Sequence, residues 1–354
     1  MSHSRGEDRR ATSASRLEAD IRSQPDMLAR LAVELAPLAA DLAQAIVRRR
    51  PRFAMIAARG SSDHAAIYGK YLLEVEAGLV AALAAPSVYS VYGRTPAARD
   101  ALAIGISQSG QSPDVVATIE GARRARALTL AVTNDPGSPL ARAAELVLPL
   151  GVDPEQSVAA TRTFTAELLA LWLLVRDLAG GDPGPARRLG EDAAAALASA
   201  ERALAAAALE GEREITVVGR GYGFPLALEV ALKLREVSRR DAQGFSAADL
   251  LHGPIVAVRP GAAAIVVGAA GPTVPSLLAC AAALRARGAR VVAIGDDPEL
   301  RRAGDLAIPV PSVPENLAVI PLAVAGQWLA LRDAAARGVD PDRPPGLAKV
   351  TRTT

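Results

Sequence analysis

The chain has 354 residues, of which 50% are hydrophobic and only 3% aromatic, and its formal net charge is +2. This length predicts two domains rather than one, with cores built mainly from Ala, Val, Leu and Ile. Basic residues are mixed with acidic ones along the chain, which argues against a nucleic-acid-binding surface.

Cysteine usage and hydropathy indicate a cytoplasmic protein. Cys280 is the single cysteine, so no disulfide can form within the chain, and its Ala-rich surroundings predict a small core residue. The N-terminal segment has no apolar signal core. No run is long, apolar and proline-free enough to span a membrane. We therefore expect neither a membrane nor a nucleic acid as a partner.

The first half of the chain reads as a polar segment followed by alternating helices and short strands. Residues 1–24 are expected to be disordered or extended. Helical apolar spacing follows over 26–50. Short apolar runs then alternate with helical stretches, which is typical of an α/β, doubly wound parallel sheet. These predicted strands are 53–58, 101–106, 127–133 and 145–150.

The same order of elements returns roughly 160 residues later, which indicates two related domains in tandem. The repeated strands are 215–218, 264–268, 291–295 and 305–309. The domains expected from this pattern are a first domain over 25–180, a linker helix over 181–209, a second domain over 210–336 and a C-terminal tail over 337–354.

A serine-rich turn follows the second predicted strand. At the carboxyl end of a parallel strand, a helix N-terminus offers free amides and a positive dipole end. Ordinary helix caps would explain one serine there. Several hydroxyls and an amide at two adjacent strand ends favour an anion site instead. The candidate phosphate-binding residues are Ser62, Ser107, Gln108, Ser109 and Ser112.

Other phosphate motifs fit poorly, and the repeat restricts the anion site to one domain. No Walker lysine follows Gly110, and residues 219–223 lack the G-x-G-x-x-G spacing of dinucleotide sites. The counterpart of the serine-rich turn, residues 268–273, reads Gly-Ala-Ala-Gly-Pro-Thr. The shared fold therefore does not by itself require the serines.

Lysine usage singles out three positions. The 40 basic Lys and Arg residues include only Lys70, Lys233 and Lys349 as lysines. Lysine, unlike arginine, can lose its proton or form an imine when partly desolvated. Lys233 precedes Glu236 by one helical turn, so the two share a face. A surface ion pair is one interpretation, and the apolar neighbours of Lys233 favour a partly buried pair.

His252 lies in a tight turn and has an ordinary pKa suited to proton relay, although a lone histidine is usually structural. The three histidines and one cysteine are widely separated, so no metal-ligand cluster is expected. No G-x-S-x-G elbow for a serine nucleophile occurs either.

Taken in order, several segments resemble the sugar isomerase (SIS) domain family. They are similar to the isomerase half of glutamine–fructose-6-phosphate aminotransferase and, more closely, to stand-alone isomerase-type glucosamine-6-phosphate deaminases. The resemblance extends from about residue 17 to the C-terminus. The matching segments are 59–64, 106–112, 157–165, 227–236, 251–254 and 346–350.

The resemblance implies a role for each candidate residue. Phosphate contacts fall on Ser62, Ser107, Gln108, Ser109 and Ser112. The proton-transfer glutamate falls on Glu236, and the active-site lysines on Lys233 and Lys349. The ring-opening histidine falls on His252, which the family donates from a neighbouring subunit. A homodimer is thereby implied, with no metal or nucleotide cofactor.

Two departures bear on the activity that the resemblance implies. The glutaminase domain of the aminotransferase, with a cysteine just after Met1, has no counterpart here, where Ser2 follows Met1. Ala160 replaces a serine that contacts the sugar. The favoured activity is conversion of glucosamine 6-phosphate and water into fructose 6-phosphate and ammonia. The alternatives are a deaminase or deglycase for another amino sugar phosphate, an ammonia-dependent synthase, and a non-catalytic sugar-phosphate sensor.

Overall fold

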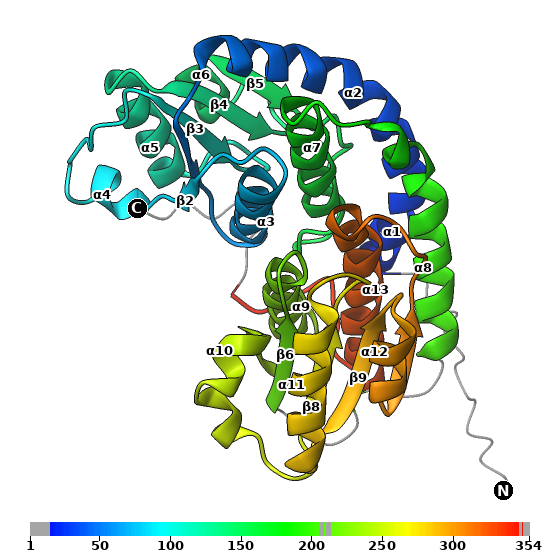
Figure 1. The fold of residues 1–354 in the computed structure, drawn as a ribbon. Coiled ribbons are helices and arrows are strands. Elements are labelled where there is room, and N and C mark those ends of the chain that lie inside the picture. Colours follow the sequence, from blue (N-terminus) through cyan, green and yellow to red (C-terminus); the bar gives the residue numbers. More distant parts are fainter. Residues whose placement is uncertain (1–14, 205–208, 210–213, 347–348, 350–354) are drawn as a thin grey trace, which may run out of the picture.

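The computed structural model describes residues 15–204, 209, 214–346 and 349, and it contains two five-stranded parallel sheets (Figure 1). The first sheet has the order β2-β1-β3-β4-β5. The second has the order β10-β9-β8-β6-β7, which is the same arrangement counted from the opposite edge. The predicted pair of doubly wound α/β domains is therefore confirmed.

The strands agree with the predicted apolar runs except at one edge of each sheet. The short strand β2 and the strand β7 were not predicted. β7 alternates exposed polar residues such as Asp241 and Gln243 with buried ones. Among the described strands it pairs with β6 alone, and as a half-exposed edge strand it has no continuous apolar run. The strands are β1 (Phe53–Ala57), β2 (Ala81–Leu83), β3 (Ala101–Ile106), β4 (Leu128–Thr133), β5 (Leu146–Pro149), β6 (Glu214–Gly219), β7 (Asp241–Ser246), β8 (Ala263–Val267), β9 (Arg290–Gly295) and β10 (Leu306–Pro309).

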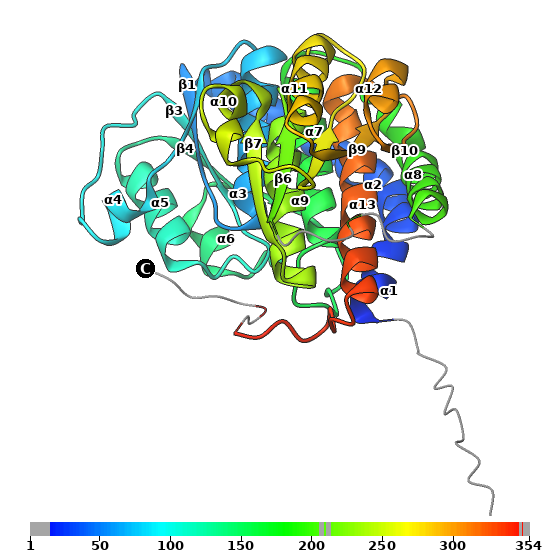
Figure 2. The same cartoon turned by 90° about the horizontal axis from the view of Figure 1, so that it is seen from below.

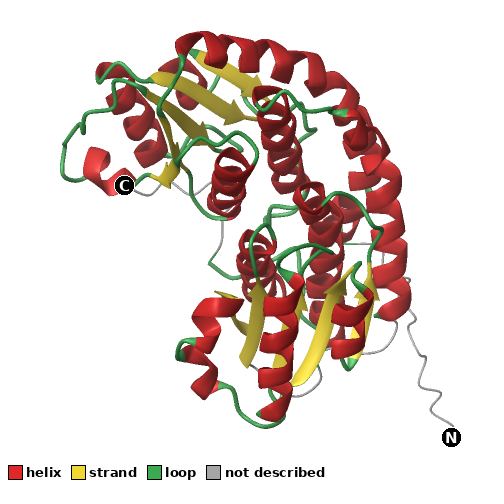
Figure 3. Ribbon diagram, viewed as in Figure 1, coloured by secondary structure: helices red, strands yellow, loops and turns green. Residues whose placement is uncertain are grey.

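Helices cover both faces of each sheet (Figure 3). Six of the helices pack with the inward faces of both sheets, and their buried side chains form one continuous core that joins the two halves. These helices are α2 (Gln24–Arg49), α3 (Ser61–Val75), α7 (Arg162–Leu178), α8 (Leu189–Ala203), α9 (Gly223–Ser238) and α13 (Glu315–Ala336). The other helices are α1 (Arg16–Arg22), α4 (Pro86–Ser90), α5 (Pro113–Arg124), α6 (Pro139–Ala143), α10 (Ala247–Leu251), α11 (Val274–Ala286) and α12 (Pro298–Ala303), with 3-10 turns at η1 (Gly184–Arg188) and η2 (Pro254–Ala257).

The central strand β3 shows how the fold brings a helix end close to a strand end. Leu102, Ile104 and Ile106 face the shared core, whereas Ala101 and Ala103 face α5 and α6. A Cβ atom on Gly105 would lie 2.7 Å from Cγ1 of Ile119. Because small residues line this face, α5 packs directly on the strand and its N-terminus lies just beyond the end of β3.

The apolar helix α13 is a core element. Among the described residues it is the one helix long and apolar enough to cross a membrane, and 94% of its apolar window is buried inside the protein. Cys280 on α11 is also fully buried, which confirms its prediction as a core residue.

The expectation of a disordered or extended segment over 1–24 is wrong where the structure describes it. Residues Arg16–Arg22 form α1, and α2 begins at Gln24. The amides of Arg16 and Leu17 donate to Asp342 of the C-terminal tail at 2.8 and 3.0 Å. This acceptor lies 326 residues along the chain from Arg16, so no local pattern could predict the contact with Asp342. The start of α1 does have a local signal, because Ser15 Oγ accepts from the amide of Glu18 at 3.1 Å. Residues 1–14 lie outside the described part.

Candidate active site

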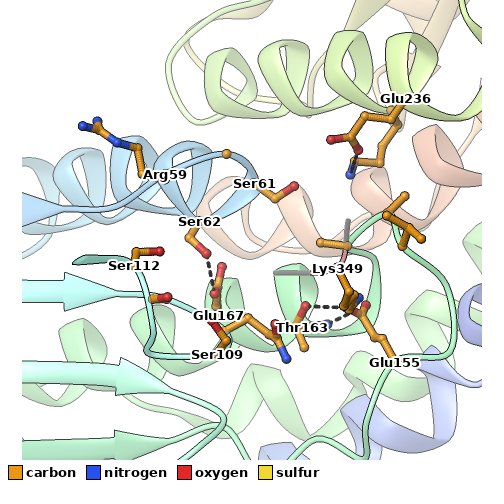
Figure 4. A pocket seen from close by; sticks show the side chains of 17 residues that line it. Arg59, Ser61, Ser62, Ser109, Ser112, Glu155, Thr163, Glu167, Glu236 and Lys349 are labelled. Carbon is orange, nitrogen blue, oxygen red and sulfur yellow. Dashed lines mark hydrogen bonds and ion pairs between the residues drawn. The ribbon is translucent and has the colours of Figure 1, made fainter. Parts of the chain in front are cut away.

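The candidate site lies at the carboxyl ends of β1 and β3, which are neighbours in the first sheet (Figure 4). Helix α3 follows β1 and helix α5 follows β3, so two helix N-termini point to one crevice. A pocket of about 320 Å³ occupies this place, within the range usual for small-molecule sites. All five residues predicted to bind phosphate line it: Ser62, Ser107, Gln108, Ser109 and Ser112.

The serine-rich turn is tightly built and leaves its hydroxyls able to donate. Gly110 has a φ of +61°, and a Cβ atom there would collide with Ser138, so only glycine fits. Ser107 Oγ and Ser109 Oγ accept hydrogen bonds from nearby backbone amides at 3.2 and 3.3 Å. Ser112 occupies the N-cap position of α5, but its hydroxyl makes no capping bond. The ordinary cap interpretation therefore does not account for Ser112.

Helix α9 from the second half supplies the predicted lysine and glutamate. Lys233 and Glu236 both line the pocket. Lys233 is only 1% exposed, so the interpretation as a surface ion pair is wrong. Its Nζ lies 2.5 Å from Glu236 Oε2 and 3.5 Å from Glu229 Oε1. Burial opposes the charge on Lys233, but the two carboxylates hold its pKa above the ordinary value, so the group is an ammonium ion.

Glu229 links the two halves beside the pocket, and it was not predicted as a site residue. Its carboxylate accepts a hydrogen bond from Ser61 Oγ at 2.9 Å and lies 2.7 Å from His64 Nδ1. Burial alone would raise its pKa, but Lys233 and then His64 hold that pKa below the ordinary value. The signal that could have found it is the helical spacing that puts Glu229, Lys233 and Glu236 on one face.

The C-terminal tail brings Lys349 to the same pocket. Beyond α13 the chain runs along one side of both halves toward the first half (Figure 2). Lys349 Nζ lies 2.8 Å from Oε2 of Glu155, whose side chain is fully buried. Glu155 also accepts hydrogen bonds from Thr161 and Thr163. Burial opposes its charge, yet Lys349 keeps its pKa below the ordinary value. Glu155, two residues before the segment 157–165, was not predicted as a site residue.

A third unpredicted acid, Glu167 on α7, lies behind Ser62. Ser62 Oγ donates to Glu167 Oε1 at 2.8 Å. Burial raises the pKa of Glu167 to about 8. Arg59 also lines the pocket, but its guanidinium pairs with Asp114 at the start of α5.

His252 is not brought to the pocket of its own chain. It is an exposed residue at the C-cap of α10, and it does not line the pocket that holds the other candidates. Lys70, on α3, also lies outside that lining. Ala160 does line the pocket, at the position where the family resemblance implies a serine. Within the described ranges, no three His, Cys, Asp or Glu side chains are grouped to hold a metal ion.

Curated relatives of the chain are longer proteins. Glutamine–fructose-6-phosphate aminotransferase (isomerizing) from Pyrococcus horikoshii is 34% identical over 304 residues, which are 83% of this chain and 51% of the relative. The enzyme of the same name from Gloeobacter violaceus is 35% identical over 309 residues, again 83% and 51%. The chain thus spans about half the length of the curated relatives it matches.

Solved structures and a family model match nearly the whole fold. A candidate phosphosugar isomerase from Silicibacter pomeroyi is 32% identical, with a TM-score of 0.82 over 93% of this chain and 100% of that one. Glucosamine-6-phosphate deaminase from Thermotoga maritima shares the fold at 22% identity, with a TM-score of 0.81 over 96% and 100%. The SIS domain model matches residues 49–176 and again 208–336. The chain therefore belongs to the SIS domain family, with two such domains in tandem.

Proposed function

We propose that this chain is an amino-sugar-phosphate deaminase that converts glucosamine 6-phosphate and water into fructose 6-phosphate and ammonia. One observation carries the proposal: a single pocket joins a hydroxyl-rich anion cradle from the first half to an ammonium–carboxylate pair from the second. The names of the relatives support it, since they combine sugar phosphates with the gain or loss of an amino group.

Phosphate binding is assigned to the turn after β3. The hydroxyls of Ser107, Ser109 and Ser112 would donate to phosphate oxygens, and the N-terminus of α5 would add its dipole. The two lysines of the pocket are engaged by Glu155, Glu229 and Glu236. The anion would therefore be held mainly by neutral donors, which leaves both ammonium groups to the other end of the sugar.

Proton transfer is assigned to Glu236. Of the two acids on α9, Glu229 and Glu236, it is the one whose side chain remains partly exposed, at 21%. Once the ring is open, its carboxylate would take the proton from C2 and return it to C1, giving an enolamine and then an imine at C2. Water would add to that imine, and ammonia would leave. Lys233 and Lys349 would stabilise negative charge that develops on the sugar oxygens.

Ammonia release is the direct test. The purified chain is offered glucosamine 6-phosphate, galactosamine 6-phosphate and a phosphorylated fructosamine, and ammonia is measured. We expect release from glucosamine 6-phosphate, and a loss of at least about 100-fold in kcat for Glu236→Gln. Glu120→Gln on the exposed face of α5 is the matched control. Consumption of ammonia with fructose 6-phosphate would instead indicate a synthase. No turnover of any substrate, with Glu236→Gln unaltered in sugar-phosphate binding, would indicate a sensor.

The placement of His252 supports a dimer in which each pocket receives this side chain from the other subunit. His252 lies in an exposed stretch that includes Leu251 and Val256, 41% and 72% exposed. A mixing experiment tests the sharing. His252→Asn and Glu236→Gln subunits are each expected to be inactive, and hybrids should regain activity because one of their two pockets is complete. Failure of refolded mixtures to regain any activity would oppose sharing between subunits.

A further inference from the structure

Glu167 is a buried carboxyl group placed directly behind a predicted phosphate ligand. Its side chain is 1% exposed, and it lines the pocket beside Ser62 (Figure 4). Ser62 Oγ lies 2.8 Å from Oε1, whereas Oε2 is buried and has no hydrogen-bond partner among the described residues. Buried polar atoms nearly always have partners, so an unpaired oxygen at a ligand pocket needs an explanation.

The charges around Glu167 do not offset a negative charge on it. Glu155 and Glu229 face it and raise its pKa further. The lysines of the pocket pair with other acids: Lys349 pairs with Glu155, and Lys233 pairs with Glu236 and Glu229. His64 Nδ1 lies against Glu229. Glu167 forms no ion pair with any described residue.

Among the described residues, the other helices packed against α7 place no cation in an ion pair with Glu167: Lys70 of α3 lies outside the pocket lining, and Arg332 of α13 is exposed. Every charged side chain of α2 is exposed. On α13, Asp333 pairs with Arg240 and Glu315 accepts from Thr273. Burial without a cation raises the pKa of Glu167 to about 8, so the group is mostly neutral near pH 7.

The protonation state of Glu167 determines whether the Ser62 hydroxyl donates its hydrogen bond to Glu167 or to a bound phosphate. A hydroxyl has one hydrogen. When Glu167 is ionised it can only accept, so Ser62 must donate to it, as the 2.8 Å contact allows. When Glu167 carries a proton it can donate to Ser62 Oγ, and the Ser62 hydrogen is free for a phosphate oxygen. Ionised Glu167 also places a negative charge next to the bound phosphate.

We propose that Glu167 is a positioning residue that turns the Ser62 hydroxyl toward the phosphate only while Glu167 is protonated, so that sugar-phosphate binding is coupled to this proton. The inference rests on the proposed function in so far as the turn after β3 holds the phosphate. It adds to that function a limit on affinity at alkaline pH.

The affinity for fructose 6-phosphate between pH 7 and pH 9 tests the coupling. This ligand has no amine to titrate, and a phosphate monoester with a second pKa of about 6 is dianionic throughout this interval. For a ligand that binds only the protonated form, Kd measured by calorimetry should rise roughly tenfold from pH 7 to pH 9.

Two variants separate Glu167 from other titrating groups. Glu167→Gln keeps a donor for Ser62 and cannot ionise, so its Kd should not change with pH. Glu315→Gln removes a different carboxyl group with a raised pKa and should keep the wild-type dependence. A wild-type Kd that is flat with pH, in a chain that releases ammonia, would overturn only this inference, as would an unchanged slope in Glu167→Gln. Absence of fructose 6-phosphate binding at every pH would overturn the proposed function as well.

Thermal stability gives a second measurement that needs no ligand. The pKa of Glu167 is higher in the folded state than the ordinary value of 4.5. Its contribution to stability is therefore fully present below about pH 4.5 and is lost as the pH rises toward 8. The Tm of Glu167→Gln relative to wild type should increase from pH 5 to pH 8 and then level off. A constant difference would show that Glu167 does not titrate in this interval and would contradict the coupling.

Discussion

The two halves of the molecule share one sheet order but fill the crevice beside their central strands with opposite chemistry. In the first half, the turn after β3 presents serine hydroxyls. In the second half, the equivalent turn at 268–273 lies among acids: the amide of Ala270 donates to Asp296 at 2.7 Å, and Thr273 donates to Glu315 at 3.2 Å. Burial, with Asp296 nearby, raises the pKa of Glu315. In their ionised form, carboxyl groups at this place would repel a phosphate.

The helices that follow β1 and β6 also differ in chemistry, but here the second half carries the groups that line the pocket with charge. Helix α3 begins with Ser61 and Ser62, whereas α9 carries Glu229, Lys233 and Glu236 on one face. The two helices meet where Ser61 and His64 contact Glu229. Equivalent positions of one fold thus supply the neutral donors of a pocket from one half and its charged groups from the other. The fold provides the crevice, and the side chains determine its chemistry.

Among the variants that test this difference between the halves, removal of the Lys349 ammonium group should have the largest effect on activity. In Lys349→Met the buried Glu155 loses its cation, and the pocket loses one of its two ammonium groups. We expect kcat for ammonia release to fall at least about 100-fold, because a positioned charge at developing negative charge is typically worth that much. Lys70→Met, the same change outside the pocket, is the control. An unchanged kcat in Lys349→Met would remove the C-terminal tail from the site.

Replacing the serine-rich turn with the residues of its counterpart tests the difference between the halves directly. Ser107→Gly with Ser109→Ala introduces the residues found at Gly268 and Ala270. Each lost bond to a charged group is worth about 1.5–3 kcal/mol. The two lost bonds should therefore raise KM for glucosamine 6-phosphate roughly 100-fold or more, with a smaller change in kcat. Thr273→Ala removes the hydroxyl of the second turn and should leave KM unchanged. Equal changes from both turns would contradict an anion site confined to the first half.

The sequence predicted those parts of the molecule whose signals are local. Buried central strands such as β3 and β8 are continuous apolar runs, and the repeat confirmed their order. The turn after β3, with Lys233 and Glu236, was recognisable from residue types and spacing. The edge strands β2 and β7 were not, because their pairing depends on segments distant in the sequence. The helix α1 was missed although it has a local signal, since the hydroxyl of Ser15 caps it by accepting from the amide of Glu18.

The three acids missed at the site share one physical reason. Glu155, Glu167 and Glu229 are almost fully buried, and in a sequence such residues look like surface acids. Their burial depends on partners from other elements: Lys349 from the tail, Ser62 from α3, and Lys233 with His64 around Glu229. Only the assembled fold shows which acids are paired and which, like Glu167, pair with no cation of the described residues.

The smallest predicted effect is on stability, and it comes from a substitution at the junction between the halves. Glu76, at the end of α3, accepts hydrogen bonds from Tyr222 Oη at 3.0 Å, Asn316 Nδ2 at 2.7 Å and Arg176 Nη1 at 3.0 Å. Tyr222→Phe removes one of the three donors and leaves the carboxylate satisfied by the others, so urea unfolding should show a loss of about 1 kcal/mol. Tyr92→Phe, at a side chain 73% exposed, should show none. Because Tyr222 does not line the pocket, KM should be unchanged. A shift in KM would mean that the position of one half relative to the other sets the geometry of the pocket.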